Sequence, residues 1–264
     1  MKSANKGFPM TLPLAGKTVL LTRPRRQAEE TRPLLENLGA SVLIQPVQEI
    51  LPAGSVPAEL FTPASLASFD WVIFSSSNGV DHLLRTLERL DRGGNERRTL
   101  LGRIRLAAVG PGTARRLEEA GFRPDLVPGL HSAEGLLREL SGEARHGARF
   151  LSIRGSGGRQ TLREGLTALG GDVQEVSLYR TREIKTPDEK IVRLMKKGAV
   201  HYTFVTSPAT AMGTVRLFGE NLRNTELVSL SPLTSAALAG AGYTPAREAA
   251  DASIAGMIGC LTRD

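Results

Sequence analysis

Five short turns rich in hydroxyl groups and glycine are the stretches of this chain best suited to bind a charged ligand. Each follows an apolar run that predicts a strand and precedes a helical pattern: Ser75–Asn78, Gly110–Thr113, Arg154–Arg159, Thr206–Thr210 and Ser231–Thr234. The first N–H groups of a helix have no partner within it, and the helix dipole favours negative charge there. Each hydroxyl could equally be an ordinary helix cap. Five such turns together favour a site for a polyanion.

A few single residues could add to this chemistry. Arg23, Arg154 and Arg159 follow predicted strand ends and could bind carboxylates through two N–H groups each. A lone arginine in such a place is usually only solvated, so the case depends on Arg23 and Arg154 holding equivalent positions in a repeat. Tyr179 could offer its hydroxyl as a weak acid, or its ring could simply pack where two domains join.

Other familiar chemistries find no support in the sequence. No Walker loop is present, and neither Gly110-Pro-Gly112 nor Gly155-Ser-Gly157 continues into G-x-G-x-x-G. The histidines at 82, 131, 146 and 201 lie apart without the spacing of metal ligands. No Ser-His-Asp or Cys-His set can be recognised. We therefore expect no metal and no nucleotide.

Composition limits the remaining classes of protein. The 264 residues, 41% of them hydrophobic, suffice for two globular domains. The net charge of +7 suits an anionic partner, but aromatic residues make up only 5% and the basic residues are dispersed, which disfavours nucleic acid. One cysteine, Cys260, excludes an internal disulfide framework, and a cytoplasmic location follows as the default.

Neither end of the chain nor its interior predicts a membrane segment. Residues 1–15 carry a short apolar run interrupted by proline, which we interpret as a loose tail and not a signal peptide. No apolar run approaches the roughly 20 residues that span a bilayer. No heptad or interface pattern stands out, so we expect a monomer without membrane partners.

An internal duplication organises the chain. Residues 147–181 repeat 16–50 at an offset of 131, so that Arg154 aligns with Arg23. The carboxy-terminal part repeats the middle at an offset of 121, and Phe74–Ser77 matches Phe204–Ser207 at 130. The chain therefore consists of two tandem copies of one unit. Gln48 stands where the second copy has Tyr179, so the tyrosine is a specialisation and not a requirement of the fold.

Alternating strand and helix patterns predict parallel sheets with helices on both faces. Residues 17–23 predict a strand, 26–38 a helix, and 41–51 one further strand that Pro46 confines to a sheet edge or excludes from a sheet.

The predicted fold is α/β: two discontinuous parallel-sheet lobes joined by a two-stranded linker. We expect residues 43–50 and 174–183 to be the crossing strands. The lobes would then be 1–46 with 182–264, and 50–177. A cleft bridged by these strands is where we expect the chemistry.

The motifs taken in order resemble those of the uroporphyrinogen-III synthase family. The resemblance runs from Gly16 to Leu261 and depends on the order and spacing of six stretches, since no single one is diagnostic. They are Thr22–Pro24, Phe74–Val80, Ala108–Ala114, Ile153–Arg159, Val176–Arg180 and Val205–Pro208. Residues 75–77 are three serines where the family usually has Thr-Ser.

The resemblance implies an enzyme that closes the linear tetrapyrrole hydroxymethylbilane, with its eight carboxylates, to uroporphyrinogen III and water. An azafulvene and then a spiro intermediate would form, and ring D would be inverted. No cofactor is implied, and hydroxymethylbilane synthase could deliver the substrate. Tyr179 is the candidate acid.

The predicted substrate contacts come from two sources. The residues that match family positions are Ser76, Ser77, Thr113, Thr206, Ser207 and Thr234. The turns and strand ends themselves add Arg23, Ser75, Gly110, Arg154, Gly155, Arg159 and Ser231.

Two alternatives remain open. A two-lobed receptor could close on an anionic small molecule without chemistry. A regulatory nucleic-acid-binding protein would predict strongly salt-dependent DNA affinity, which the dispersed arginines disfavour.

Overall fold

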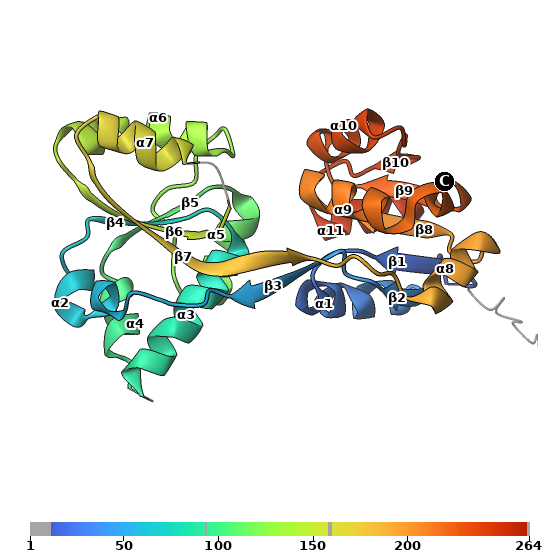
Figure 1. Ribbon diagram of the computed structural model, residues 1–264, viewed down its shortest axis with the longest axis horizontal. Helices are drawn as coiled ribbons and strands as arrows, with labels where there is room; N and C mark the ends of the chain where they lie inside the picture. Colours follow the sequence, from blue (N-terminus) through green and yellow to red (C-terminus); the bar gives the residue numbers. More distant parts are fainter. Residues whose placement is uncertain (1–11, 93, 158–159, 263–264) are drawn as a thin grey trace, which may run out of the picture. The chain divides into compact units, whose positions relative to one another are not determined.

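The computed structural model describes residues 12–92, 94–157 and 160–262. Strands and helices alternate along the chain, and the strands form two sheets dominated by parallel pairs (Figure 1). The predicted α/β class with two parallel sheets is therefore confirmed. By its contacts the chain divides into two compact units. We call the chain up to Glu49 and from Arg182 the terminal unit, and Ile50–Thr181 the central unit.

The sheet of the terminal unit has the order β10-β9-β8-β1-β2. Its strands are β1 (Thr18–Leu21), β2 (Ser41–Ile44), β8 (Tyr202–Val205), β9 (Glu226–Ser229) and β10 (Arg247–Glu248), all paired in parallel. Successive side chains of a strand point to opposite faces. Val19 and Leu21 therefore join one apolar cluster and Leu20 another, so both faces of this sheet are buried.

Helices cover both faces of that sheet. Helices α1 (Arg25–Glu36) and α11 (Ile254–Thr262) pack on the side of Val19. The opposite side carries α8 (Glu189–Lys196), α9 (Pro208–Phe218), α10 (Pro232–Gly240) and the 3-10 helix η2 (Gly219–Asn224).

The second sheet has the order β3-β7-β6-β4-β5. Its strands are β3 (Gln48–Pro52), β4 (Trp71–Phe74), β5 (Arg105–Ala108), β6 (Arg149–Gly155) and β7 (Asp172–Glu183). Strand β7 pairs with β6, β6 with β4 and β4 with β5, all in parallel. Val72 and Phe74 point into one apolar cluster and Trp71 and Ile73 into another.

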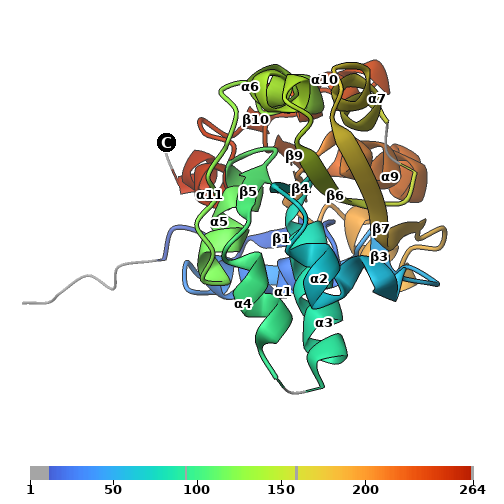
Figure 2. The ribbon, with the colours of Figure 1, turned by 90° about the vertical axis from the view of Figure 1, so that its left-hand side faces the viewer.

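Helices also cover both faces of the second sheet. Helices α6 (Ala133–Arg145) and α7 (Thr161–Ala168) lie on one side (Figure 2). The other side carries η1 (Ala58–Phe61), α2 (Pro63–Leu66), α3 (Ser77–Asp91), α4 (Glu96–Leu101) and α5 (Pro111–Glu119).

The prediction of one strand over residues 41–51 is wrong. Strand β2 ends at Ile44 and β3 begins at Gln48, because Pro46 between them has no N–H to donate to a sheet. Strand β3 is antiparallel to β7, since Ile184 N–H bonds to Val47 while Ala53 N–H bonds to Leu178. The unit boundaries fall within β3 and β7. We keep as a proposal that residues 43–50 and 174–183 cross between two domains, 1–46 with 182–264 and 50–177. Within 43–50 the crossing strand is then β3 and not β2.

Candidate active site

The predicted site residues follow the carboxyl ends of strands. Carboxyl ends of parallel strands meet at one edge of a sheet, so residues that follow strands of the same sheet share that edge. In the terminal unit Arg23 follows β1, Thr206 and Ser207 follow β8, and Ser231 and Thr234 follow β9. In the central unit Ser75, Ser76 and Ser77 follow β4, Gly110 and Thr113 follow β5, and Arg154 and Gly155 end β6.

Two of the turns have their helix starts capped by serine. The Ser76 side chain accepts a hydrogen bond from Gly79 N–H at 3.2 Å and begins α3. The Ser207 side chain does the same for Thr210 N–H at 3.1 Å, in a reciprocal capping box that begins α9. Both serines therefore hold helix ends in place, as the capping interpretation of these turns expected.

The turns before α5 and α10 lack side-chain caps. Their N-cap residues are Gly110 and Ser231, and neither makes a side-chain bond to a helix N–H. Pro111 and Pro232 have no N–H, and the N–H groups of Thr113 and Thr234 bond to the carbonyls of Gly110 and Ser231 at 3.1 and 2.9 Å. The donors left for a ligand or water at these two starts are therefore the N–H groups of Gly112 and Leu233. The hydroxyls of Thr113 and Thr234 are in contrast buried, and their contact with a ligand stays a prediction.

The fifth turn, Arg154–Arg159, begins at the end of β6 and precedes α7. Strand β6 ends at Gly155, and α7 begins at Thr161, with Gln160 as an N-cap residue whose side chain caps no helix N–H. The helix therefore begins two residues after the end of the predicted turn, Arg154–Arg159. Arg159 lies outside the described residues.

Tyr179 lies in β7 with 8% of its surface exposed. Its hydroxyl oxygen is 2.7 Å from Ser76 Oγ, although the two residues are 103 positions apart in the chain. Its ring stacks on the imidazole of His82, with centroids 5.3 Å apart and planes inclined by 23°. The phenol is therefore held at its hydroxyl end and along one face of its ring.

Gly155 supplies the space beside that ring. A Cβ atom at Gly155 would lie 2.5 Å from Tyr179 Cε2, which no real contact allows. The pairing of β6 with β7 shifts register between Arg154 and Gly155, and Ser156 N–H then bonds to the Tyr179 carbonyl at 2.8 Å. This bulge brings the glycine next to the phenol.

His82 is the residue of this environment that the sequence prediction missed. The sequence predicted a surface or structural residue here and assigned it no place at the site. Among the described residues no group of three or more His, Cys, Asp or Glu could hold a metal ion. Its spacing in the sequence could have revealed it. Ser76, Gly79 and His82 are three residues apart, which places them near one side of the start of α3.

The two equivalent arginines have diverged. Arg154 is buried, and its Nη1 pairs with Glu175 at 2.9 Å while its Nε donates to Gly155 O. Arg23 instead donates to the neutral side chains of Gln27 and Thr31 at 3.1 to 3.3 Å, and burial lowers the pKa of its guanidinium. The position equivalent to Glu175 is Ile44 (175 − 131 = 44). Among the described residues Arg23 has no carboxylate within 4 Å, so it suits a ligand carboxylate better than Arg154 does.

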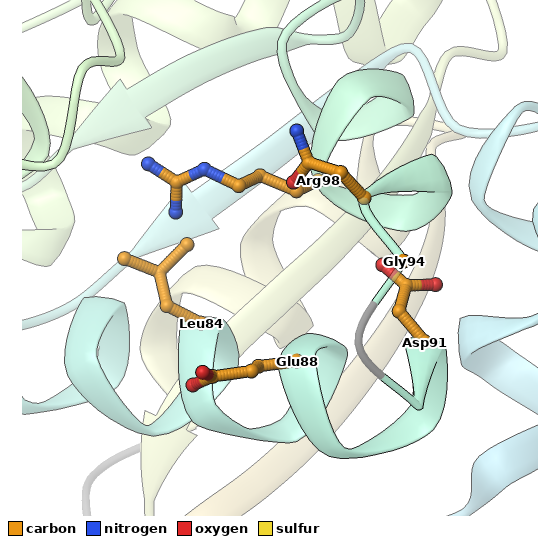
Figure 3. Close-up of a pocket in the computed structure, with 6 residues that line it drawn as sticks. Leu84, Glu88, Asp91, Gly94 and Arg98 are labelled. Atoms are coloured by element: carbon orange, nitrogen blue, oxygen red, sulfur yellow. The ribbon is translucent and has the colours of Figure 1, made fainter.

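A pocket of about 300 Å³ lies elsewhere in the central unit (Figure 3). It is lined by Leu84, Glu88 and Asp91 of α3, and by Arg98 of α4. Asp91 is paired with Arg97 at 2.7 Å, and the pocket lies at the opposite end of α3 from Ser76. None of the predicted site residues lines it, so it is not the candidate site.

These features define a class of protein: an α/β chain of two parallel-sheet units with hydroxyl- and glycine-containing turns at the strand ends and a buried, hydrogen-bonded tyrosine. None of the described helices is long and apolar enough to cross a membrane. A family model described as uroporphyrinogen-III synthase HemD matches residues 29–259. The chain therefore belongs to the uroporphyrinogen-III synthase family.

Individual relatives agree with this assignment. Uroporphyrinogen-III synthase of Synechococcus elongatus is 30% identical over 212 residues, which cover 80% of this chain and 78% of that protein. The synthase of Chlorobaculum parvum is 29% identical and covers 84% of this chain and 88% of its own length.

Solved structures support the fold. A mutant uroporphyrinogen III synthase from Thermus thermophilus aligns over 94% of this chain and 98% of its own, with a TM-score of 0.61 at 21% identity. The enzyme from Helicobacter pylori aligns over 92% and 97%, with a TM-score of 0.60 at 18% identity.

Proposed function

We propose that this protein is a uroporphyrinogen-III synthase, which converts hydroxymethylbilane to uroporphyrinogen III with inversion of ring D and loss of water. The observation that carries the proposal is the match of the family model to residues 29–259. The hydrogen-bonded Tyr179, at the same sheet edge as the donor turns of the central unit, suits this chemistry.

The donors at the strand ends would hold the substrate carboxylates. The uncapped starts of α5 and α10 and the guanidinium of Arg23 each suit a carboxylate. Because hydroxymethylbilane carries eight carboxylates, its binding energy can be spread over many weak contacts. No single donor is then indispensable, and loss of one should mainly raise KM.

Tyr179 would act on the hydroxyl group that leaves ring A. Transfer of its phenol proton to that oxygen lets the C–O bond break and water depart, while the electron pair of the pyrrole nitrogen forms the azafulvene. The azafulvene carbon then bonds to the substituted carbon of ring D, and the spiro product fragments and recloses. The final loss of a ring proton restores the phenol, so no atom is oxidised or reduced overall.

The main task of the protein would be geometric. Azafulvene formation needs little acid catalysis, so the free substrate can also close without inverting ring D, which gives the type I isomer. Holding the chain so that the substituted carbon of ring D lies in reach is what selects type III. We also propose that hydroxymethylbilane synthase delivers the substrate to a cytoplasmic monomer, since delivery shortens the time available for spontaneous closure.

The test is to supply hydroxymethylbilane, stop the reaction at intervals, oxidise the products and separate the porphyrin isomers. The type III isomer should dominate with wild-type protein, and type I alone should form without protein. Type I alone in both samples would overturn the proposal.

A further inference from the structure

We propose that Ser76 is a positioning residue that donates its hydroxyl proton to the Tyr179 oxygen, which leaves the tyrosine proton directed at the substrate. This inference rests on the proposed function for its catalytic meaning. The hydrogen bond itself, at 2.7 Å between Ser76 Oγ and Tyr179 Oη, is compatible with either direction.

The cap of helix α3 occupies one acceptor site of Ser76 and leaves its proton to be placed. Ser76 Oγ already accepts the Gly79 N–H at 3.2 Å. A hydroxyl has one proton to donate, and among the described residues Tyr179 Oη is the only acceptor within reach of that proton. If Tyr179 donated instead, Ser76 would accept twice and leave its proton without a partner in the described protein. Donation from Ser76 gives the Ser76 proton an acceptor and leaves the Tyr179 proton for the substrate, which is what a general acid requires.

The other copy of the repeat uses its serine differently. Ser76 and Ser207 have matching backbone angles, with φ of −167° and −164° and ψ of 160° and 161°, and each caps a helix. The two serines are 131 positions apart (207 − 76), so the expected match of Phe74–Ser77 with Phe204–Ser207 at an offset of 130 is wrong by one residue. The reason is that β4 ends at Phe74, whereas β8 continues one residue beyond Phe204. In this copy Ser207 bonds to Thr210, and Gln48 stands at the position of Tyr179. The serine-to-tyrosine bond is therefore specific to the central unit.

The direction of this bond matters for proton transfer. When the Tyr179 O–H bond breaks, its proton goes to the departing oxygen, and the C–O bond electrons leave with that oxygen as water. The phenolate that remains accepts the Ser76 hydrogen bond, which strengthens as charge develops. The proton that ring closure later releases returns to the phenolate. If Tyr179 instead donated to Ser76, its proton would point away from the substrate.

Two substitutions of nearly equal shape distinguish donation by Ser76 from donation by Tyr179. Ser76→Asn and Ser76→Asp both provide an oxygen that can cap α3. Asn also carries an N–H that can donate to Tyr179, whereas an ionised Asp only accepts and turns the tyrosine proton toward itself. We expect Ser76→Asp to lower kcat by about as much as Tyr179→Phe, within the roughly 10²–10⁴-fold range of general-acid assistance. Ser76→Asn should lose far less.

Controls separate this effect from helix capping and from charge. Ser132 caps α6 through Gly135 N–H at 3.1 Å and is not a predicted site residue. Ser132→Asn and Ser132→Asp should therefore give equal kcat. In a Tyr179→Phe background the difference between Ser76→Asn and Ser76→Asp should vanish. Equal kcat for the two Ser76 variants, or an unchanged difference in that background, would overturn the inference.

A second measurement needs no substrate and so separates this inference from the proposed function. Protein with ¹³C at the tyrosine Cζ atoms gives one signal for Tyr179, assigned by its loss in Tyr179→Phe. This signal should move downfield in Ser76→Asp, where the phenol donates to a carboxylate, and stay near the wild-type position in Ser76→Asn. If the wild-type signal instead lies with that of Ser76→Asp, the tyrosine is the donor and the inference fails, whatever the activity.

Discussion

Gly155 lies against the ring of Tyr179 so closely that a methyl group at Gly155 would be 2.5 Å from Tyr179 Cε2. Gly155→Ala should therefore displace the phenol from Ser76 and lower kcat toward the value of Tyr179→Phe. Steady-state kinetics, with urea unfolding to confirm that the variant is folded, provide the measurement.

Gly142→Ala is the matched control for this prediction. Gly142 lies within α6, and a Cβ there meets nothing within 4 Å. This change should leave kcat unaltered and raise the free energy of unfolding by up to about 1 kcal/mol, the helix preference for alanine. A Gly155→Ala protein with wild-type kcat would show that the position of the ring is unimportant.

Tyr179→Phe should retain measurable activity. The phenyl ring can keep its contact with His82 and its place beside Gly155, so the loss is confined to the hydroxyl and its proton. We expect kcat to fall by no more than about 10²–10⁴-fold, with KM nearly unchanged. A folded variant with no turnover at all would contradict a mechanism in which positioning dominates.

The two equivalent arginines should respond differently to removal of their charge. Arg23→Met should raise KM about tenfold, the cost of one charge-assisted hydrogen bond, with little change in stability. Arg154→Met should instead lower the free energy of unfolding by about 3 kcal/mol, because it leaves the Glu175 carboxylate without its buried partner. Steady-state kinetics of both variants measure KM, and urea titration measures the free energy of unfolding. Equal effects on KM would mean that the pairing with Glu175 does not distinguish them.

The surface ion pair of Arg105 and Glu143 should make the stability of the protein depend on pH. Hydrogen bonds from Arg105 at 2.9 and 3.0 Å hold the pKa of the Glu143 carboxyl below its ordinary value. The folded state then binds a proton less readily than the unfolded chain. The ion pair therefore stabilises the folded state fully above the pKa of Glu143 in the unfolded chain, about 4.3. This stabilisation is lost as the pH falls through the lower pKa of Glu143 in the folded protein.

Urea midpoints of wild-type protein and Glu143→Gln between pH 7 and pH 3 measure this effect. The wild-type protein should have the higher midpoint at pH 7, and the difference should disappear toward pH 3. High salt should reduce it at pH 7, since both side chains are partly exposed. A difference that grows as the pH falls would contradict the assigned cause.

Much of the fold was predictable because it depends on local patterns and on duplication. The apolar run at Thr18–Leu21, the helix that ends near Gly39 and the helix start at Ser132 follow directly from hydrophobic spacing and turn chemistry. The break between Ile44 and Gln48 was only half predicted. Pro46 indicated an edge position, but which partner strand each side would find depends on distant pairing.

The details of the site were less predictable because they depend on contacts across the chain. Position 76 was predicted to bind substrate, yet its bond to Tyr179 joins residues 103 positions apart. Gly155 was assigned to the ligand from its turn, while its close contact with the phenol arises from a shift in strand register. The ion pair of Arg154 with Glu175 likewise requires β6 and β7 to be neighbours.

The central claim is that the protein turns over hydroxymethylbilane and inverts ring D. The most direct measurement uses substrate in large excess over protein and counts type III product per protein molecule. We predict many type III molecules per molecule of protein, with type I at the level of spontaneous closure. A yield of type III product that never exceeds the amount of protein, or type I product alone, would contradict the assignment and favour a receptor that binds without chemistry.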